Sequence, residues 1–211
     1  MCRSFETSIT TYLATVVSTV IVWNLTTLPI YRFIALIMLV VGHMQLIDAL
    51  LWTTIRYKWS ATNLFVSRYI LPTLLATELL ASYYGIRYFF GWSNRLYEVI
   101  LWFGIFCLFY SWLIDCNETI KHTDGYLLWC NDTYRVISQL GFLFLLVFPI
   151  IMGYPNILLK WILLGAIIGT FAINFLRSTY GTRWCWSSNI ISVILLAVVL
   201  YERYIAKKKM N

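Results

Sequence analysis

Charge is scarce in this sequence: 12% of its 211 residues are Asp, Glu, Lys or Arg, whereas 61% are hydrophobic. A soluble domain carries about 25% charged residues, so the composition excludes a soluble globular domain. Clusters of basic residues are scarcer still. The net charge is +7, yet the one basic run is 207–209, so no basic face is available to follow the phosphates of a nucleic acid.

Histidine is nearly absent, with His43 and His122 alone in the whole chain. Membrane hydrolases with a zinc centre like that of the alkaline ceramidases need three histidines, so we expect neither that chemistry nor a metal or cofactor. The sequence also lacks an HExxH zinc motif and a GxSxG nucleophile elbow. We therefore expect that the protein is not an enzyme, although lipid- or thiol-directed catalysis through Cys2 or Cys185 stays open.

Long apolar runs are what the sequence has instead. A helix that crosses a bilayer needs about 20 apolar residues, and the runs are continuous rather than alternating, which favours helices over a barrel. We predict an all-α, multi-pass membrane protein in which residues 1–211 form a single seven-helix domain. The predicted helices cover 9–25, 32–55, 63–84, 96–115, 135–153, 156–176 and 187–204. The last of them contains no lysine, which excludes a retinal Schiff base.

The longest predicted loop, 116–134, indicates which side of the membrane the N-terminus occupies. It contains glycosylation sequons at Asn117 and Asn131, and each of these follows a cysteine, Cys116 or Cys130. In an oxidising lumen the two cysteines could form a disulfide worth about 3 kcal/mol. These features predict a luminal loop and a luminal N-terminus; idle thiols and chance sequons are the alternative.

The C-terminal tail favours the same orientation. Lys208 and Lys209 stand fourth and third from the end, an ending that resembles the dilysine retrieval signal of endoplasmic-reticulum membrane proteins. That signal acts on a cytosolic tail and would make coat machinery a partner. A basic tail held against anionic lipid is the alternative. We predict a multi-pass protein of the endoplasmic-reticulum membrane with a cytosolic C-terminus.

Polar residues interrupt the second predicted helix, in the stretch GHMQLIDALLW at 42–52. On a helix, Gln45, Asp48 and Trp52 fall within about 60° of one another. A carboxylate at the bilayer centre costs about 2.5–3.5 kcal/mol, so such a residue has to be paired, protonated or solvated. Arg135 and Arg177 are the predicted partners of the carboxyl groups.

Further polar residues lie in the same half of other predicted helices. They are Glu78, Gln139 and Asn174. Because the opposite halves are mostly apolar, we predict a polar chamber open to the lumen, in which these residues and the Gln45–Asp48 face bind a proton or small ligand. The alternative is that they are interhelical glue, each hydrogen bond contributing about 0.6 kcal/mol.

The two ends of the chain add a family resemblance. The chain opens MCRSFETS and reaches WCWSSN at its last predicted helix. It resembles an uncharacterised family of seven-helix membrane proteins that open Met-Cys-aromatic-Ser, carry Gln, an acidic residue and Trp in the second helix, and begin the last helix with Trp-Cys. Arg3 stands where an aromatic residue is usual, and Asp48 where glutamate is commoner. The resemblance implies a site but no reaction.

Besides Gln45 and Asp48, the residues that carry the resemblance lie at the luminal edge of the predicted bundle. We expect them to surround the mouth of the chamber: Cys2, Ser4, Trp52, Trp184 and Cys185. A Cys2–Cys185 disulfide and two separate thiols both stay open.

Three functions are compatible with this sequence. The first is a carrier or channel for a small ligand or for protons, because two intramembrane carboxyls face a one-sided chamber. The second is a non-catalytic membrane organiser or receptor-like subunit of the endoplasmic reticulum. The third is a lipid- or thiol-directed membrane enzyme. Beyond the lipid bilayer, the expected partner is an unknown small ligand or ion.

Overall fold

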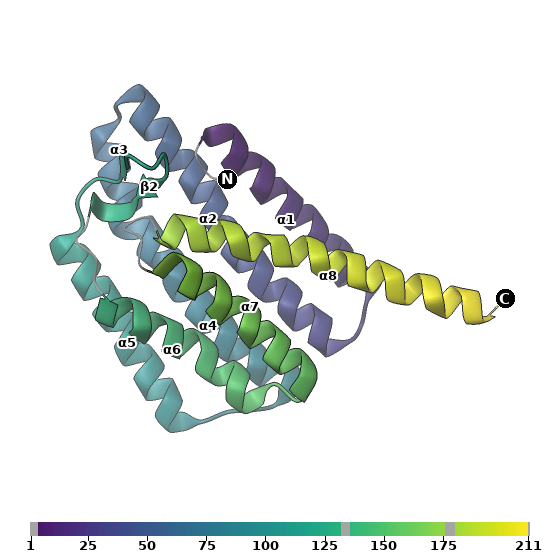
Figure 1. The fold of residues 1–211 in the computed structure, drawn as a ribbon. Helices are drawn as coiled ribbons and strands as arrows, with labels where there is room; N and C mark the ends of the chain where they lie inside the picture. Colours follow the sequence, from purple (N-terminus) through teal and green to yellow (C-terminus); the bar gives the residue numbers. More distant parts are fainter. Residues whose placement is uncertain (1–3, 132–135, 176–179, 211) are drawn as a thin grey trace.

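The computed structural model describes residues 4–131, 136–175 and 180–210, and 85% of the structure is helical (Figure 1). The prediction of an all-α protein is confirmed. The helices are α1 (Phe5–Leu25), α2 (Pro29–Tyr57), α3 (Ser60–Phe65), the π-helical turn η1 (Val66–Ile70), α4 (Leu71–Phe90), α5 (Arg95–Asp115), the short 3₁₀ turn η2 (Trp129–Asn131), α6 (Val136–Gly153), α7 (Ile157–Phe175) and α8 (Tyr180–Met210). The strands are β1 (Ile120–Lys121) and β2 (Leu127–Leu128).

Among the described residues, four helical segments are long and apolar enough to cross a membrane. They are α1, α2, the continuous Ser60–Phe90 segment formed by α3, η1 and α4, and α5. The described apolar parts of α6 and α7 are shorter, Gln139–Gly153 and Lys160–Ala172. Length and composition therefore define a helical protein of the multi-pass membrane class.

Helix α2 lies at the centre of the bundle (Figure 1). It packs against α1, α4 and α8, while α4 also packs against α6. The core along these contacts is built from large apolar side chains that are almost completely buried, among them Phe33, Met38, Met44, Leu79 and Ile86. Helix α5 lies at the rim and buries the least of the four spans. The buried face of α2, which includes Gln45 and Asp48, is thus enclosed by neighbouring helices.

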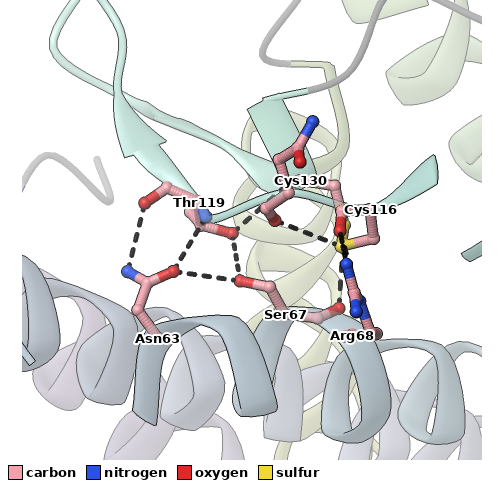
Figure 2. Close-up of a disulfide and its surroundings, with 7 residues drawn as sticks. Asn63, Ser67, Arg68, Cys116, Thr119 and Cys130 are labelled. Atoms are coloured by element: carbon pink, nitrogen blue, oxygen red, sulfur yellow. Dashed lines mark hydrogen bonds between the residues drawn. A yellow bond between two sulfur atoms is a disulfide. The ribbon is translucent and has the colours of Figure 1, made fainter. Parts of the chain in front are cut away.

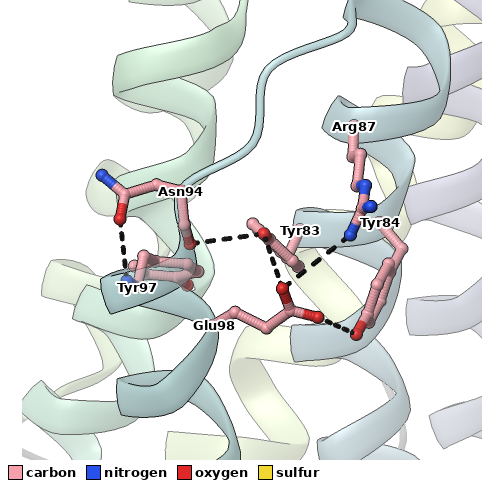
Figure 3. Close-up of polar contacts among 6 residues, drawn as sticks. All are labelled: Tyr83, Tyr84, Arg87, Asn94, Tyr97 and Glu98. Carbon is pink, nitrogen blue, oxygen red and sulfur yellow. Dashed lines mark hydrogen bonds and ion pairs between the residues drawn. The ribbon is translucent and has the colours of Figure 1, made fainter.

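The α4–α5 hairpin is closed by a polar cluster around Glu98 (Figure 3). The Tyr84 hydroxyl donates to Glu98 Oε1 at 2.7 Å, and Arg87 Nη1 lies 3.8 Å from Oε2. Gly91 ends α4 with a φ of +75°, a conformation that suits glycine, and the Asn94 side chain caps α5. These contacts fix the rim helix α5 against the centre of the bundle.

Candidate functional site

Asp48 lies inside α2 with none of its surface exposed. Its Oδ1 accepts a hydrogen bond of 2.9 Å from the indole Nε1 of Trp129, 81 residues further along the chain. Its Oδ2 has no hydrogen-bond partner within the described residues. The arginines that we expected beside the carboxyls, Arg135 and Arg177, lie outside the described residues. The partner that the structure shows is instead the indole of Trp129, which lies in the predicted 116–134 loop.

Trp129 reaches Asp48 because the loop between α5 and α6 folds back over the end of the bundle. Cys116 and Cys130 form a disulfide at the base of this loop, which is the pairing that we expected. Between them, β1 and β2 form a two-stranded antiparallel ribbon that turns at Gly125, where φ is +84°. We call residues 116–131 the cover. Asp48 therefore lies beneath the cover rather than in a chamber open to solvent.

Three polar side chains bind the cover to the start of the α3–α4 segment (Figure 2). The Thr119 backbone N–H donates to Asn63 Oδ1 at 2.8 Å, and Asn63 Nδ2 donates to the Thr119 carbonyl at 3.1 Å. The hydroxyls of Ser67 and Thr119 lie 2.7 Å apart. Beside them, Arg68 Nη2 donates to the Cys116 carbonyl at 2.8 Å. We call Asn63, Ser67 and Thr119 the latch; all three are buried and hydrogen-bonded.

The latch residue Ser67 lies on the π-helical turn η1, which ends just before Pro72. Proline has no N–H, so it cannot complete the regular α-helical ladder at this point. The structure accommodates it with a π turn, in which the Leu71 N–H bonds to the Val66 carbonyl. Turns of this kind are rare and occur frequently at functional sites.

Replacing Asn63 with alanine tests the latch. The substitution leaves the buried Thr54 hydroxyl and both backbone groups of Thr119 without their Asn63 bonds. We expect the free energy of unfolding to fall by about 1–2 kcal/mol, measured by thermal melting in detergent. Asn24→Ala is the control, because Asn24 is exposed and its side chain bonds, within the described residues, to the Val20 carbonyl of its own helix. Equal melting temperatures for both variants would contradict the role of the latch.

Glu78 is the second buried carboxyl, at 1% exposure in α4. Neither of its oxygens has a hydrogen-bond partner in the described part of the chain. The hydroxyl of Ser82, one turn further on, does not bond to Glu78. It donates to the Leu146 carbonyl at 2.7 Å and so connects α4 to α6. Helix α4 packs directly on α2, so the two buried carboxyls lie on neighbouring helices.

Polar side chains on other helices are also buried. Gln45 has no exposed surface, and Gln139 of α6 is 5% exposed with its Oε1 lacking a partner among the described residues. Asn174 lies on α7, but its side chain is outside the described part. Sequence reasoning missed Asn189 of α8, which is 2% exposed and whose amide atoms have no partner in the described residues. Its position in WCWSSN was the available signal.

Helix α1 approaches α2 closely beside Asn189. A Cβ added at Gly42 would lie 2.7 Å from Thr15 Cγ2 and 3.8 Å from Asn189 Oδ1. Ser192, one turn along α8, lies 3.4 Å from the Thr15 hydroxyl. The glycine that opens the GHMQLIDALLW stretch thus leaves room beside α2 for the polar contact between α1 and α8.

Of the residues predicted at the chamber mouth, the structure describes the side chains of Ser4 and Trp52, and these two make different contacts. Ser4 caps α1, since its Oγ accepts from the Thr7 N–H at 3.3 Å. Trp52 packs against a small buried cluster that includes Leu127 of the cover, and Lys121 Nζ lies 5.9 Å from its ring centre. Cys2 and the side chains of Trp184 and Cys185 lie outside the described residues.

The residues predicted to carry glycans and those predicted to form the retrieval signal lie at opposite ends of the structure. The Asn117 side chain is exposed on the cover. Asn131 ends η2, and its side chain is outside the described part. Lys208 and Lys209 lie on the last turns of α8, far from the cover (Figure 1).

Comparisons with models of known families, with curated proteins and with solved structures find no match. The family resemblance of the sequence therefore stays a prediction. The class that the fold and site define is a multi-pass helical membrane protein with buried polar groups between its helices, of which Asp48 lies beneath the disulfide-closed cover. We call the buried residues Asp48, Glu78 and Asn189 the acidic centre. Chemically, this centre offers carboxyl and amide groups that can bind a proton or a small polar ligand.

Proposed function

We propose that this protein is a carrier or channel for protons or for a small polar ligand, with Asp48 and Glu78 as its binding groups. The observation that carries the proposal is Glu78, which is 1% exposed and makes no hydrogen bond to any described residue. A buried polar group without a partner costs about 1–3 kcal/mol. A role in binding gives a reason to retain such a group.

The latch provides an internal comparison. Its buried side chains bond to one another and to the cover, as expected of residues whose role is to hold segments of the structure together. The acidic centre differs, because Glu78, Asp48 Oδ2 and the Asn189 amide all lack partners among the described residues. A purely structural role therefore explains the latch, but it does not explain why the acidic centre has buried polar groups without partners. This contrast supports a binding site.

The cover would then control access to the centre. Trp129 occupies one oxygen of Asp48 and packs against the core. Movement of the indole would free that oxygen and open a path from the end of the bundle where the cover lies. The latch and the disulfide confine this movement to the cover instead of the helices.

The proposal includes seven membrane crossings, a luminal N-terminus and residence in the endoplasmic reticulum. Four segments meet the length and composition of a span, and α6, α7 and α8 are the remaining three crossings. The described start of the chain lies at the end of the bundle that carries the cover, and the dilysine tail extends from the other end (Figure 1). That arrangement agrees with a luminal cover and a cytosolic tail.

Glycosylation tests this orientation. We expect the chain to carry a glycan at Asn117 when it is made in a eukaryotic cell, because this side chain is exposed on the cover. Treatment with an endoglycosidase should increase gel mobility, and Asn117→Gln should remove the corresponding glycan. Asn24→Gln is the control, because Asn24-Leu-Thr would face the cytosol. A glycan at Asn24 and none on the cover would show that the orientation is the reverse of the one proposed.

Proton flux tests the function itself. The full chain is reconstituted into liposomes that enclose a pH-sensitive dye, and an external acid pulse is applied. We expect uptake above that of empty liposomes, and a fall of at least about tenfold in Glu78→Gln and Asp48→Asn. Ser82→Ala, on the same helix as Glu78, should keep most of the flux. If the wild type and both carboxyl variants match empty liposomes, the proton form of the proposal is wrong.

An organiser or receptor-like subunit is the second candidate. Beside the cover, the rings of Tyr57 and Trp59 stack at 5.4 Å and are each more than half exposed. Exposed aromatic residues are enriched in protein interfaces. This function requires no flux, and it predicts that Trp59→Ala removes a partner while Glu78→Gln does not.

A further inference from the structure

A groove lies where the α1–α2 connection meets α8. In Figure 1 this connection lies at the end of the bundle opposite the cover. Its volume is about 290 Å³, near the lower end of the roughly 300–1,000 Å³ that small-molecule sites occupy. The residues that line it are Asn24, Leu25, Thr26, Thr27, Leu28, Val199, Glu202 and Arg203. The groove thus combines apolar side chains, hydroxyl and amide groups, one carboxylate and one guanidinium.

The two charged groups of the groove are adjacent on α8. The Tyr31 hydroxyl donates to Glu202 Oε1 at 2.5 Å, which holds this carboxylate in place. Arg203 is exposed, and neither Glu202 nor Arg203 forms a salt bridge within the described residues. A ligand in the groove therefore meets two exposed charged groups on successive residues of α8: a carboxylate that is hydrogen-bonded to Tyr31 and a guanidinium without a salt bridge in the described residues.

A second arginine supports the wall of the groove. Arg32 Nε donates to the Thr26 carbonyl at 2.9 Å, and its guanidinium lies 5.2 Å from the ring centre of Trp23. These contacts fix the three-residue connection between α1 and α2 and leave Arg203 as the cation that lines the groove. The groove is thus a shaped feature of the fold.

We propose that this groove binds the phosphoethanolamine group of a zwitterionic phospholipid. Arg203 would bind the phosphate, a pairing that a guanidinium makes with two donors. Glu202 would accept hydrogen bonds from the ammonium group. Leu25, Leu28 and Val199 would contact the glycerol and the start of the acyl chains. An anionic headgroup without an amine would leave Glu202 beside negative charge, and a simple cation would leave Arg203 unpaired.

The position of the groove favours a lipid as the source of this group. The groove lies between the end of α1, the start of α2 and the last third of α8. The first two are ends of candidate spans, so the groove lies where the headgroups of a bilayer begin. Free phosphoethanolamine has the same polar chemistry but lacks the apolar part that the leucines and Val199 would contact.

Native mass spectrometry of the full chain in detergent tests the proposal. The probes are dioleoyl-phosphatidylethanolamine, dioleoyl-phosphatidylcholine, dioleoyl-phosphatidic acid and free phosphoethanolamine. We expect one retained phosphatidylethanolamine, bound more tightly than phosphatidylcholine, whose quaternary amine cannot donate to Glu202. Arg203→Gln should weaken its binding about tenfold and Glu202→Gln several-fold, as loss of a charge-assisted hydrogen bond implies. Arg95→Gln, at an exposed arginine that opens α5, should change nothing.

Three results would overturn the proposal. One is phosphatidic acid that binds more tightly than phosphatidylethanolamine and gains affinity in Glu202→Gln. Another is equal retention of all lipids by the wild type and Arg203→Gln. Displacement of the lipid by equimolar free phosphoethanolamine would reassign the groove to a soluble phosphomonoester. Tyr31→Phe is a second variant, used in case the charge variants misfold. It keeps both charges, and we expect it to reduce the preference for phosphatidylethanolamine over phosphatidic acid.

Discussion

Replacing both Cys116 and Cys130 with serine is expected to lower the free energy of unfolding by about 3 kcal/mol, the loop-closure value for a disulfide across 14 residues. The bond closes the base of the cover, so its loss increases the freedom of the unfolded chain. It also loosens the segment that carries Trp129 to Asp48. Chemical denaturation in detergent measures the change.

Reduction of the wild type should have the same effect as the double substitution, and a reductant should have no effect on the serine variant. Cys107→Ser is the matched control, because Cys107 is a free, exposed cysteine of α5. If the double variant unfolds at the same denaturant concentration as Cys107→Ser, the disulfide does not hold the cover in place.

Replacing Glu78 with methionine is expected to stabilise the protein by about 2–3 kcal/mol. The carboxyl is buried and makes no hydrogen bond to a described residue, so its removal breaks none of the described contacts. It also eliminates the insertion cost of an acidic residue within a membrane helix, about 2.5–3.5 kcal/mol. Methionine has a similar length and adapts to its surroundings, so no large cavity is left. Thermal melting in detergent measures the gain.

Ser82→Ala, one turn away on the same helix, is the control with the opposite expected sign. It leaves the buried Leu146 carbonyl without the Ser82 hydroxyl and should destabilise by about 1 kcal/mol. A loss of stability in Glu78→Met would mean that the carboxyl is structural glue. The organiser function would then be the better proposal.

Helix positions were predictable because they follow from local signals. The predicted spans mark the apolar part of each helix, whereas the helices themselves extend into polar sequence where a cap allows it. Ser4 starts α1 at Phe5 instead of residue 9, and Pro29 opens α2 three residues before the predicted start. Helix α8 continues to Met210, beyond the predicted end at 204. Hydropathy measures compatibility with a bilayer and does not report where a helix ends.

The acidic centre was predictable in part. Asp48 and Glu78 are conspicuous because carboxyls are rare in apolar runs, and the cysteines beside the sequons indicated the disulfide. The bond from Trp129 to Asp48 had no local signal, because the two residues are 81 positions apart. Asn63 and Thr119 are likewise 56 positions apart. Contacts of this kind arise from the way the cover folds back on the bundle, which no periodic pattern records.

The control of access to Asp48 by the cover is tested most directly by proton uptake of Trp129→Phe in the liposome assay. Phenylalanine fills most of the same space but cannot donate the hydrogen bond to Asp48. Trp112→Phe is the matched control, because the Trp112 indole N–H has no partner among the described residues. We predict that Trp129→Phe takes up protons several-fold faster than the wild type, while Trp112→Phe equals it. Equal rates in all three proteins would contradict the claim that the cover controls access to the acidic centre.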